Sequence, residues 1–152
     1  MGRDDVLKFW FGESDEVTPE LIREAAIASL RGGETFYAHN HGLPELREAI
    51  GTYTAGLHPK ATGPEWAQRV VVTSGGVSAL MLACQALLDA GDEVVAVTPV
   101  WPNLVAQPAI MGATVRTVSL QPGPNGLWQL DMQALLSAVT PSTRLLVLNA
   151  PN

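Results

Sequence analysis

Two short segments of this chain contain residue types that suit a flat, phosphorylated ligand. The first is TSGGVS, residues 73–78, where Gly75 and Gly76 lead directly into an apolar helical run. Glycine lets the backbone turn sharply and approach a ligand closely, and free N–H groups at a helix start attract anions. The pair matches neither the G-x-G-x-x-G pattern nor the P-loop. By itself, the turn leaves two interpretations open, a phosphate site and a plain tight connection.

The second segment is TPVWPN, residues 98–103, in which Trp101 stands between two prolines. An aromatic side chain held rigidly at a strand end can stack on a flat ring, although a tryptophan of a core or an interface is the alternative. Taken together, a phosphate turn and a stacking ring at neighbouring strand ends favour a phosphorylated aromatic cofactor.

The elements that carry these segments alternate along the chain. Thr18 is a good N-cap for a helix that runs to Leu30, with Pro19 in its first turn, and Pro44 begins a second helix. Strands are then expected at 69–73, 93–99, 113–120 and 143–149, and helices at 78–90, which is apolar nearly all round and ends at Gly91, at 103–111, and after Asp131. This alternation predicts an α/β fold of three layers, with a mostly parallel sheet flanked by helices. Ligands of such sheets bind at the carboxyl ends of the strands.

Composition and charge exclude several classes of partner. The net charge is −6 and no cluster of lysines and arginines occurs, so neither nucleic acid nor an anionic membrane is an expected partner. No apolar run is long enough to span a membrane, and the N-terminus lacks a signal-peptide pattern, which predicts a cytoplasmic protein. Only 16% of the residues are charged, which predicts a surface covered by further chain or by a partner subunit.

Read together, four stretches resemble the class I/II aminotransferases of pyridoxal 5'-phosphate (PLP) fold type I. They are YAHNHGLPELREAI (37–50), the run from VVVTSGG to VWPN (70–103), MGATVRTVSL (111–120) and LLVLNAPN (145–152). The resemblance extends from about Gly12 to Asn152, with the motifs in the order of the family. It implies an incomplete large domain of this PLP fold, which would divide the chain into an N-terminal arm (1–17), a helical segment (18–60) and a partial PLP-binding domain (61–152).

The resemblance also implies roles for individual residues. Gly75, Gly76 and Val77 match the turn whose backbone amides hold the PLP phosphate, and Trp101 matches the aromatic residue that stacks on the pyridine ring. Tyr37 matches the tyrosine that reaches the cofactor phosphate of the neighbouring subunit, so a homodimer is expected.

The substrates implied by the resemblance are an amino acid and a 2-oxo acid. Gly12 matches the glycine whose backbone lies beside the substrate carboxylate, and Trp101 would border the same space. Some relatives that favour acidic substrates have a lysine where Val77 stands, which argues slightly against a dedicated aspartate enzyme.

The residue that forms the Schiff base is missing from the matching segments. In the family, this lysine, the acid that pairs with the pyridinium nitrogen and the substrate-binding arginine all lie beyond the point matched by Asn152. Lys8 and Lys60 are the two lysines here, and both are expected to be solvated surface residues. No catalytic residue is therefore assigned, and a truncated, inactive fragment that binds PLP weakly or not at all is expected.

Other functions remain as alternatives. A C–S lyase-type PLP enzyme shares the same front half, and the same fold can serve as a non-catalytic effector-binding module. A dinucleotide-binding domain is less compatible, because Thr98 and Pro99 stand where an acid is needed after the second strand.

The histidines and the single cysteine do not predict a site of their own. His39, His41 and His58 have no Cys, Asp or Glu partners at ligand spacing, so no metal site is expected. Cys84 lies in an apolar helical run and is expected to be a small core residue.

Overall fold

A computed structural model describes residues 5–7, 12, 14–59 and 66–150 of the chain. It forms two compact units, Met1–Asn40 and His41–Asn152, which are described separately. The division into 1–17, 18–60 and 61–152 stays a prediction.

The first unit contains one helix, α1 (Glu20–Arg31), within its described residues. Glu20 in the first turn and Arg31 in the last complement the helix dipole. The predicted N-cap, Thr18, is wrong by one position. Pro19 has extended backbone angles and its carbonyl accepts the first helical hydrogen bonds, so Pro19 is the N-cap.

The second unit begins with α2 (Pro44–Leu57), which packs against a short 3-10 helix, η1 (Trp66–Arg69). Pro44 occupies the first turn of α2, as predicted. Gly51 is buried at this contact, where an added Cβ atom would lie 3.2 Å from the Ala67 nitrogen. The close approach of the two helices therefore depends on a residue without a side chain.

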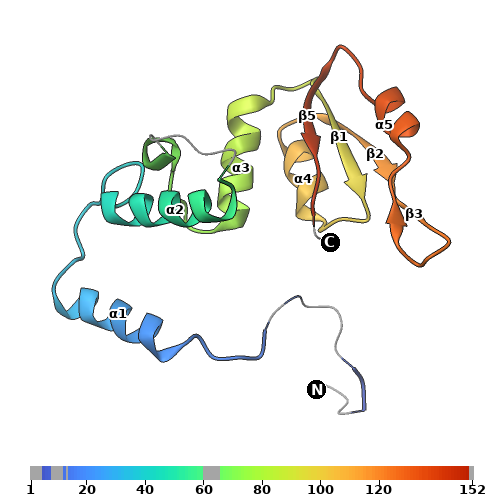
Figure 1. Ribbon diagram of the computed structural model, residues 1–152. Helices are drawn as coiled ribbons and strands as arrows, with labels where there is room; N and C mark the ends of the chain where they lie inside the picture. Colours follow the sequence, from blue (N-terminus) through green and yellow to red (C-terminus); the bar gives the residue numbers. More distant parts are fainter. Residues whose placement is uncertain (1–4, 8–11, 13, 60–65, 151–152) are drawn as a thin grey trace. The chain divides into compact units, whose positions relative to one another are not determined.

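A parallel sheet of three strands forms the centre of the second unit (Figure 1). Its order is β2 (Thr114–Ser119), β1 (Glu93–Thr98), β5 (Thr143–Val147), so β1 pairs on both edges. Four consecutive residues of β1 are buried, which confirms the expectation from its β-branched run.

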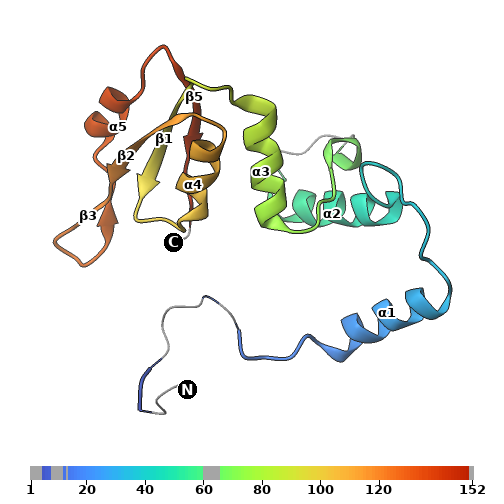
Figure 2. The ribbon, with the colours of Figure 1, turned by 180° about the vertical axis from the view of Figure 1, so that it is seen from behind.

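Helices cover both faces of this sheet and complete the three layers that the sequence predicts (Figures 1 and 2). One face packs against α4 (Asn103–Ile110) and against Cys84 of α3 (Gly76–Leu87), and the other packs against α5 (Met132–Ala138). Alternate side chains of β1 divide between two buried clusters: Cys84, Leu88, Val94 and Ala113 on the first face, and Val95, Val97, Val118 and Leu135 on the second. Cys84 is thus a core residue, as predicted.

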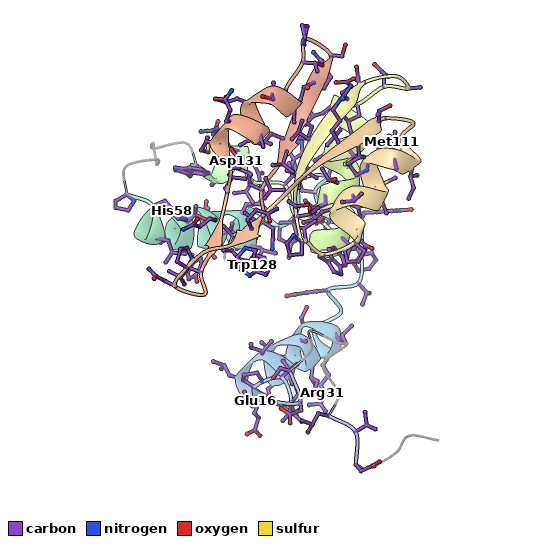
Figure 3. The ribbon with its side chains drawn as sticks, turned by 90° about the vertical axis from the view of Figure 1, so that its right-hand side faces the viewer. Glu16, Arg31, His58, Met111, Trp128 and Asp131 are labelled. Atoms are coloured by element: carbon purple, nitrogen blue, oxygen red, sulfur yellow. The ribbon has the colours of Figure 1, made fainter. Side chains whose placement is uncertain are left out.

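The sequence also locates the start of α5 correctly. The Asp131 carboxylate accepts hydrogen bonds from the backbone N–H groups of Gln133 and Ala134, and the residue lies at the helix start in Figure 3. A short antiparallel hairpin before it, β3 (Gln121–Pro122) and β4 (Trp128–Gln129), was not predicted.

The predicted strand at 69–73 is wrong. Residues 70–73 have no regular secondary structure and pair with none of the described strands. Their backbone is held instead by α2 and the loop before it. The Val72 N–H donates to the His41 carbonyl (2.9 Å), and the Arg47 Nε donates to the Val70 carbonyl (2.9 Å).

The predicted helix at 78–90 needs two corrections. It begins at Gly76 and ends at Leu87, and Gly91 lies in the following turn with φ +96°, where its N–H donates to Gly112. It is also not buried all round, since Cys84 is its one buried residue and Leu82 is 52% exposed. Its outward face is left uncovered by the part of the chain that the structure describes.

None of the helices within the described residues is long and apolar enough to cross a membrane.

The amino ends of the strands are joined by a polar cluster. Glu93 of β1 accepts hydrogen bonds from Arg116 of β2 (2.7 Å) and from the Thr140 hydroxyl (2.6 Å), which precedes β5. These two bonds, with the Arg116 bond foremost, hold the pKa of Glu93 below its usual value. The charged carboxylate therefore stabilises the folded sheet.

We expect Glu93→Gln to lower stability at pH 7, because the neutral amide loses the ionic component with Arg116. A depressed pKa contributes stability above the pKa of the unfolded glutamate, about 4.3, and this contribution disappears as the pH falls through the folded value. The difference between wild type and variant in urea unfolding should thus shrink below about pH 4.3. Glu48→Gln, on the exposed surface of α2, is the control and should show no comparable convergence.

Candidate active site

A glycine turn precedes α3 at the carboxyl side of the segment 70–73. Gly75 is the N-cap residue and has φ +135°, a conformation that side-chain-bearing residues rarely adopt. The Thr73 hydroxyl donates to the Gly75 carbonyl (2.9 Å), and the Ser74 and Ser78 hydroxyls lie 3.0 Å apart across the turn. We call residues 73–78 the glycine turn.

The backbone donors of this turn point away from the helix. The Ala79 N–H makes the first helical hydrogen bond, to the Gly75 carbonyl (3.1 Å), so the N–H groups of Gly76, Val77 and Ser78 have no partner within α3. An added Cβ atom at Gly75 or Gly76 would meet no described atom within 4 Å. Open space, free donors and the positive end of a helix dipole together suit a phosphate group.

Trp101 borders a hollow of about 340 Å³ next to α3. The side chain is 46% exposed, and it follows a cis peptide bond between Thr98 and Pro99. The hollow is mostly apolar and is lined by residues of α3, α4 and β5, among them Leu80, Leu104 and Leu146, and by Asn149, which follows β5. An aromatic face is therefore available beside the helix that begins with the glycine turn.

A residue that the sequence analysis overlooked connects these two parts. Gln107 of α4 is only 6% exposed, and its Nε2 donates to the Val77 carbonyl in the first turn of α3 (3.0 Å). Its Oε1 atom is buried and has no hydrogen-bond partner among the described residues. The available signal was one amide side chain in NLVAQPAI, an otherwise apolar helix apart from its first residue.

The titratable groups near the hollow do not include a reactive nucleophile within the described residues. Burial raises the pKa of the Cys84 thiol, which keeps it protonated and unreactive. Among the residues that the structure describes, no three His, Cys, Asp or Glu side chains lie close enough together to hold a metal ion.

The structure does not test several of the predicted site residues. Tyr37 and Gly12 are exposed and belong to the first unit, so their predicted roles stay predictions. Lys8 and Lys60 lie outside the described residues, as do Pro151 and Asn152 of the predicted motif.

The family model for aminotransferases of class I and II matches residues 4–152. The chain belongs to this family. It is 35% identical to the aspartate aminotransferase of Thermotoga maritima and 36% identical to the aspartate/prephenate aminotransferase of Thermus thermophilus, with 98% and 97% of the chain aligned. These alignments cover 38% and 37% of the two enzymes, so the chain spans little more than a third of their length.

Solved structures agree with the sequence relatives. The aspartate aminotransferase of Thermotoga maritima has a TM-score of 0.85 at 35% identity, over 97% of this chain and 38% of the enzyme. The N-succinyldiaminopimelate aminotransferase of Mycobacterium tuberculosis has the same score at 34% identity, over 93% and 36%. The three-layer α/β fold of this aminotransferase chain is thus that of known family members.

We expect Gly75→Ala to destabilise the chain by about 1–3 kcal/mol, since alanine would be held at a strained positive φ. Gly76→Ala is the matched control. It lies within the helix with open space around it and should change the free energy of unfolding by no more than about 1 kcal/mol. Urea denaturation measures both, and equal effects would contradict the assigned turn geometry.

Proposed function

We propose that this chain supplies the phosphate-binding turn and the ring-stacking aromatic of a PLP-dependent aminotransferase. One observation carries the proposal. The glycine turn, with its open N–H groups, begins α3, and residues of α3 line the same hollow as the half-exposed Trp101. Gln107 of α4 joins the two parts by its bond to the first turn of α3.

The residues present fit the cofactor. The N–H groups of Gly76, Val77 and Ser78 would hold the phosphate, with Gly75 allowing close approach, and Trp101 would cover one face of the pyridine ring. When bound, PLP supplies an electron sink for the carbon that carries the amino group. The contribution of this chain would be to orient the ring, to exclude water from one of its faces and to stabilise the phosphate anion by hydrogen bonds.

The activity of the whole protein is proposed from this site and from the family. It would transfer an amino group from an amino acid to a 2-oxo acid. The relatives named above are aminotransferases, which favours transfer over the C–S lyase alternative. Their names include aspartate, whereas Val77 argued slightly against a dedicated aspartate enzyme, so the choice of amino acid stays open to assay.

Assembly and location extend the same proposal. Phe36 and Tyr37 are 90% and 107% exposed, which is unusual for neighbouring aromatic residues and supports a surface that a second subunit covers. Tyr37 of a homodimer would then contact the cofactor phosphate of its partner. We also propose a cytoplasmic location, in line with the expectation from the N-terminal sequence.

We further propose that this chain does not transaminate by itself. Chemistry on PLP needs a lysine amine at the ring, and neither Lys8 nor Lys60 lies at a predicted strand end. This chain would thus bind the cofactor weakly and would not catalyse the reaction.

Pyridoxamine 5'-phosphate tests the binding site without the complication of a reactive aldehyde. It should shift the amide resonances of Gly75 and Gly76, and Trp101→Leu should weaken its affinity by about three- to tenfold, the range of one aromatic stacking contact. Trp128→Leu is the control, on the hairpin strand β4 (Figure 3). Equal affinities in the two variants would argue against stacking on Trp101.

Borohydride reduction in the presence of PLP tests the absence of a reacting lysine. We expect slow labelling of lysines that rises in proportion to PLP concentration, because exposed amines react without a site. Peptide mass spectrometry identifies the labelled residues. Saturable labelling of one lysine at one equivalent would overturn the proposal that the chain is inactive.

A further inference from the structure

We propose that Gln107 is a positioning residue that sets the spacing between the glycine turn and Trp101. The inference rests on the proposed function and adds a residue that contacts neither the phosphate nor the ring. Its position in the fold explains how α3 and α4 keep the phosphate contact and the ring contact at a constant spacing for one ligand.

The hydrogen bond from Gln107 to Val77 has a proposed ligand contact close to each of its two residues. The Trp101 carbonyl accepts a hydrogen bond from the Leu104 N–H (3.0 Å), so Trp101 is attached to the first turn of α4. Gln107 lies on the same helix, and its Nε2 reaches the Val77 carbonyl, two residues after Gly75. A single side chain therefore links the helix that carries the ring contact to the turn that carries the anion contact.

Packing alone does not account for a glutamine at this position. The side chain is 6% exposed, and its Oε1 atom has no partner among the described residues, so burying the amide leaves an unsatisfied acceptor. The orientation of the Gln107 amide follows from its partner, because the Val77 carbonyl can accept a hydrogen bond only from the NH₂ group. A methionine would fill a similar volume and remove the unsatisfied Oε1 atom, while the Val77 carbonyl, in the first turn of α3, would keep its helical hydrogen bond. The glutamine is thus better explained by the bond it makes to Val77.

The start of α3 is the place where such a bond has most effect. The helix has no side-chain N-cap hydrogen bond, and helix ends open more readily than helix centres. The phosphate of the cofactor is joined to its flat ring by a linker of two atoms, so only a limited range of separations between the two contacts suits it. Gln107 would hold the first turn of α3 against α4 and so keep that distance constant.

Gln107→Met tests the inference in the chain as it is. We expect a free energy of unfolding that is unchanged or higher, faster hydrogen exchange of amides 79–81, which make the first hydrogen bonds of α3, and a Kd for pyridoxamine 5'-phosphate about three- to tenfold weaker, as for one lost hydrogen bond. The control is Gln85→Met, an exposed glutamine of α3, which should leave the Kd unchanged.

Gln107→Glu gives a second, pH-dependent measurement. The introduced carboxylate cannot donate to the Val77 carbonyl, but its protonated form can, and burial would raise its pKa. The ratio of the variant Kd to the wild-type Kd should therefore fall toward one as the pH is lowered. Using the ratio cancels the protonation of the ligand phosphate, which affects both proteins.

The outcomes separate this inference from the proposed function. If Gln107→Met lowers stability and affinity together, or fails to fold, the residue is structural and the inference is wrong. If the wild type binds and neither the exchange nor the Kd changes in the variant, the inference is wrong and the proposed function stands. If the wild type shows no shift at Gly75 and Gly76, the proposed function fails, and this inference fails with it.

Discussion

The burial of β1 on both faces is the constraint on which the rest of the second unit depends. Its alternate side chains enter two separate cores, so helices must cover both sides of the sheet. Because its neighbours β2 and β5 are both parallel to it, the chain must return to the same end of the sheet through a crossover connection before each new strand. Those returns bring Trp101 and Asn149 to the same hollow, which is the edge where α/β sheets bind ligands.

The amino and carboxyl ends of the strands differ in what their polar groups do. At the amino ends, Glu93 bonds to Arg116 and Thr140 and so ties the three strands together with charge and hydrogen bonds. At the carboxyl ends, polar backbone groups are left available, and Gly75 provides an opening rather than a contact. Stability and binding are thus separated in space, which allows the glycine turn to keep unsatisfied donors without loss of the core.

Much of the architecture could be predicted from local patterns. The continuous β-branched run predicted β1, and Asp131 predicted the start of α5, because each signal is satisfied by residues within a few positions. The strand expected at 69–73 had an equally clear apolar pattern but pairs with none of the described strands, and hydrogen bonds join it to His41 and Arg47 instead. Apolar character alone also failed for α3, since its burial depends on what covers it.

The sequence by itself determined the family resemblance, the glycine turn and Trp101, since these are read from residue types at short spacing. Only the tertiary structure decided that the turn opens to space, that Trp101 shares a hollow with α3, and that Gln107 reaches Val77. The physical reason is the distance along the chain. Gln107 and Val77 are separated by 30 positions, and only the folded packing of α3 against α4 makes a buried amide and a distant carbonyl neighbours.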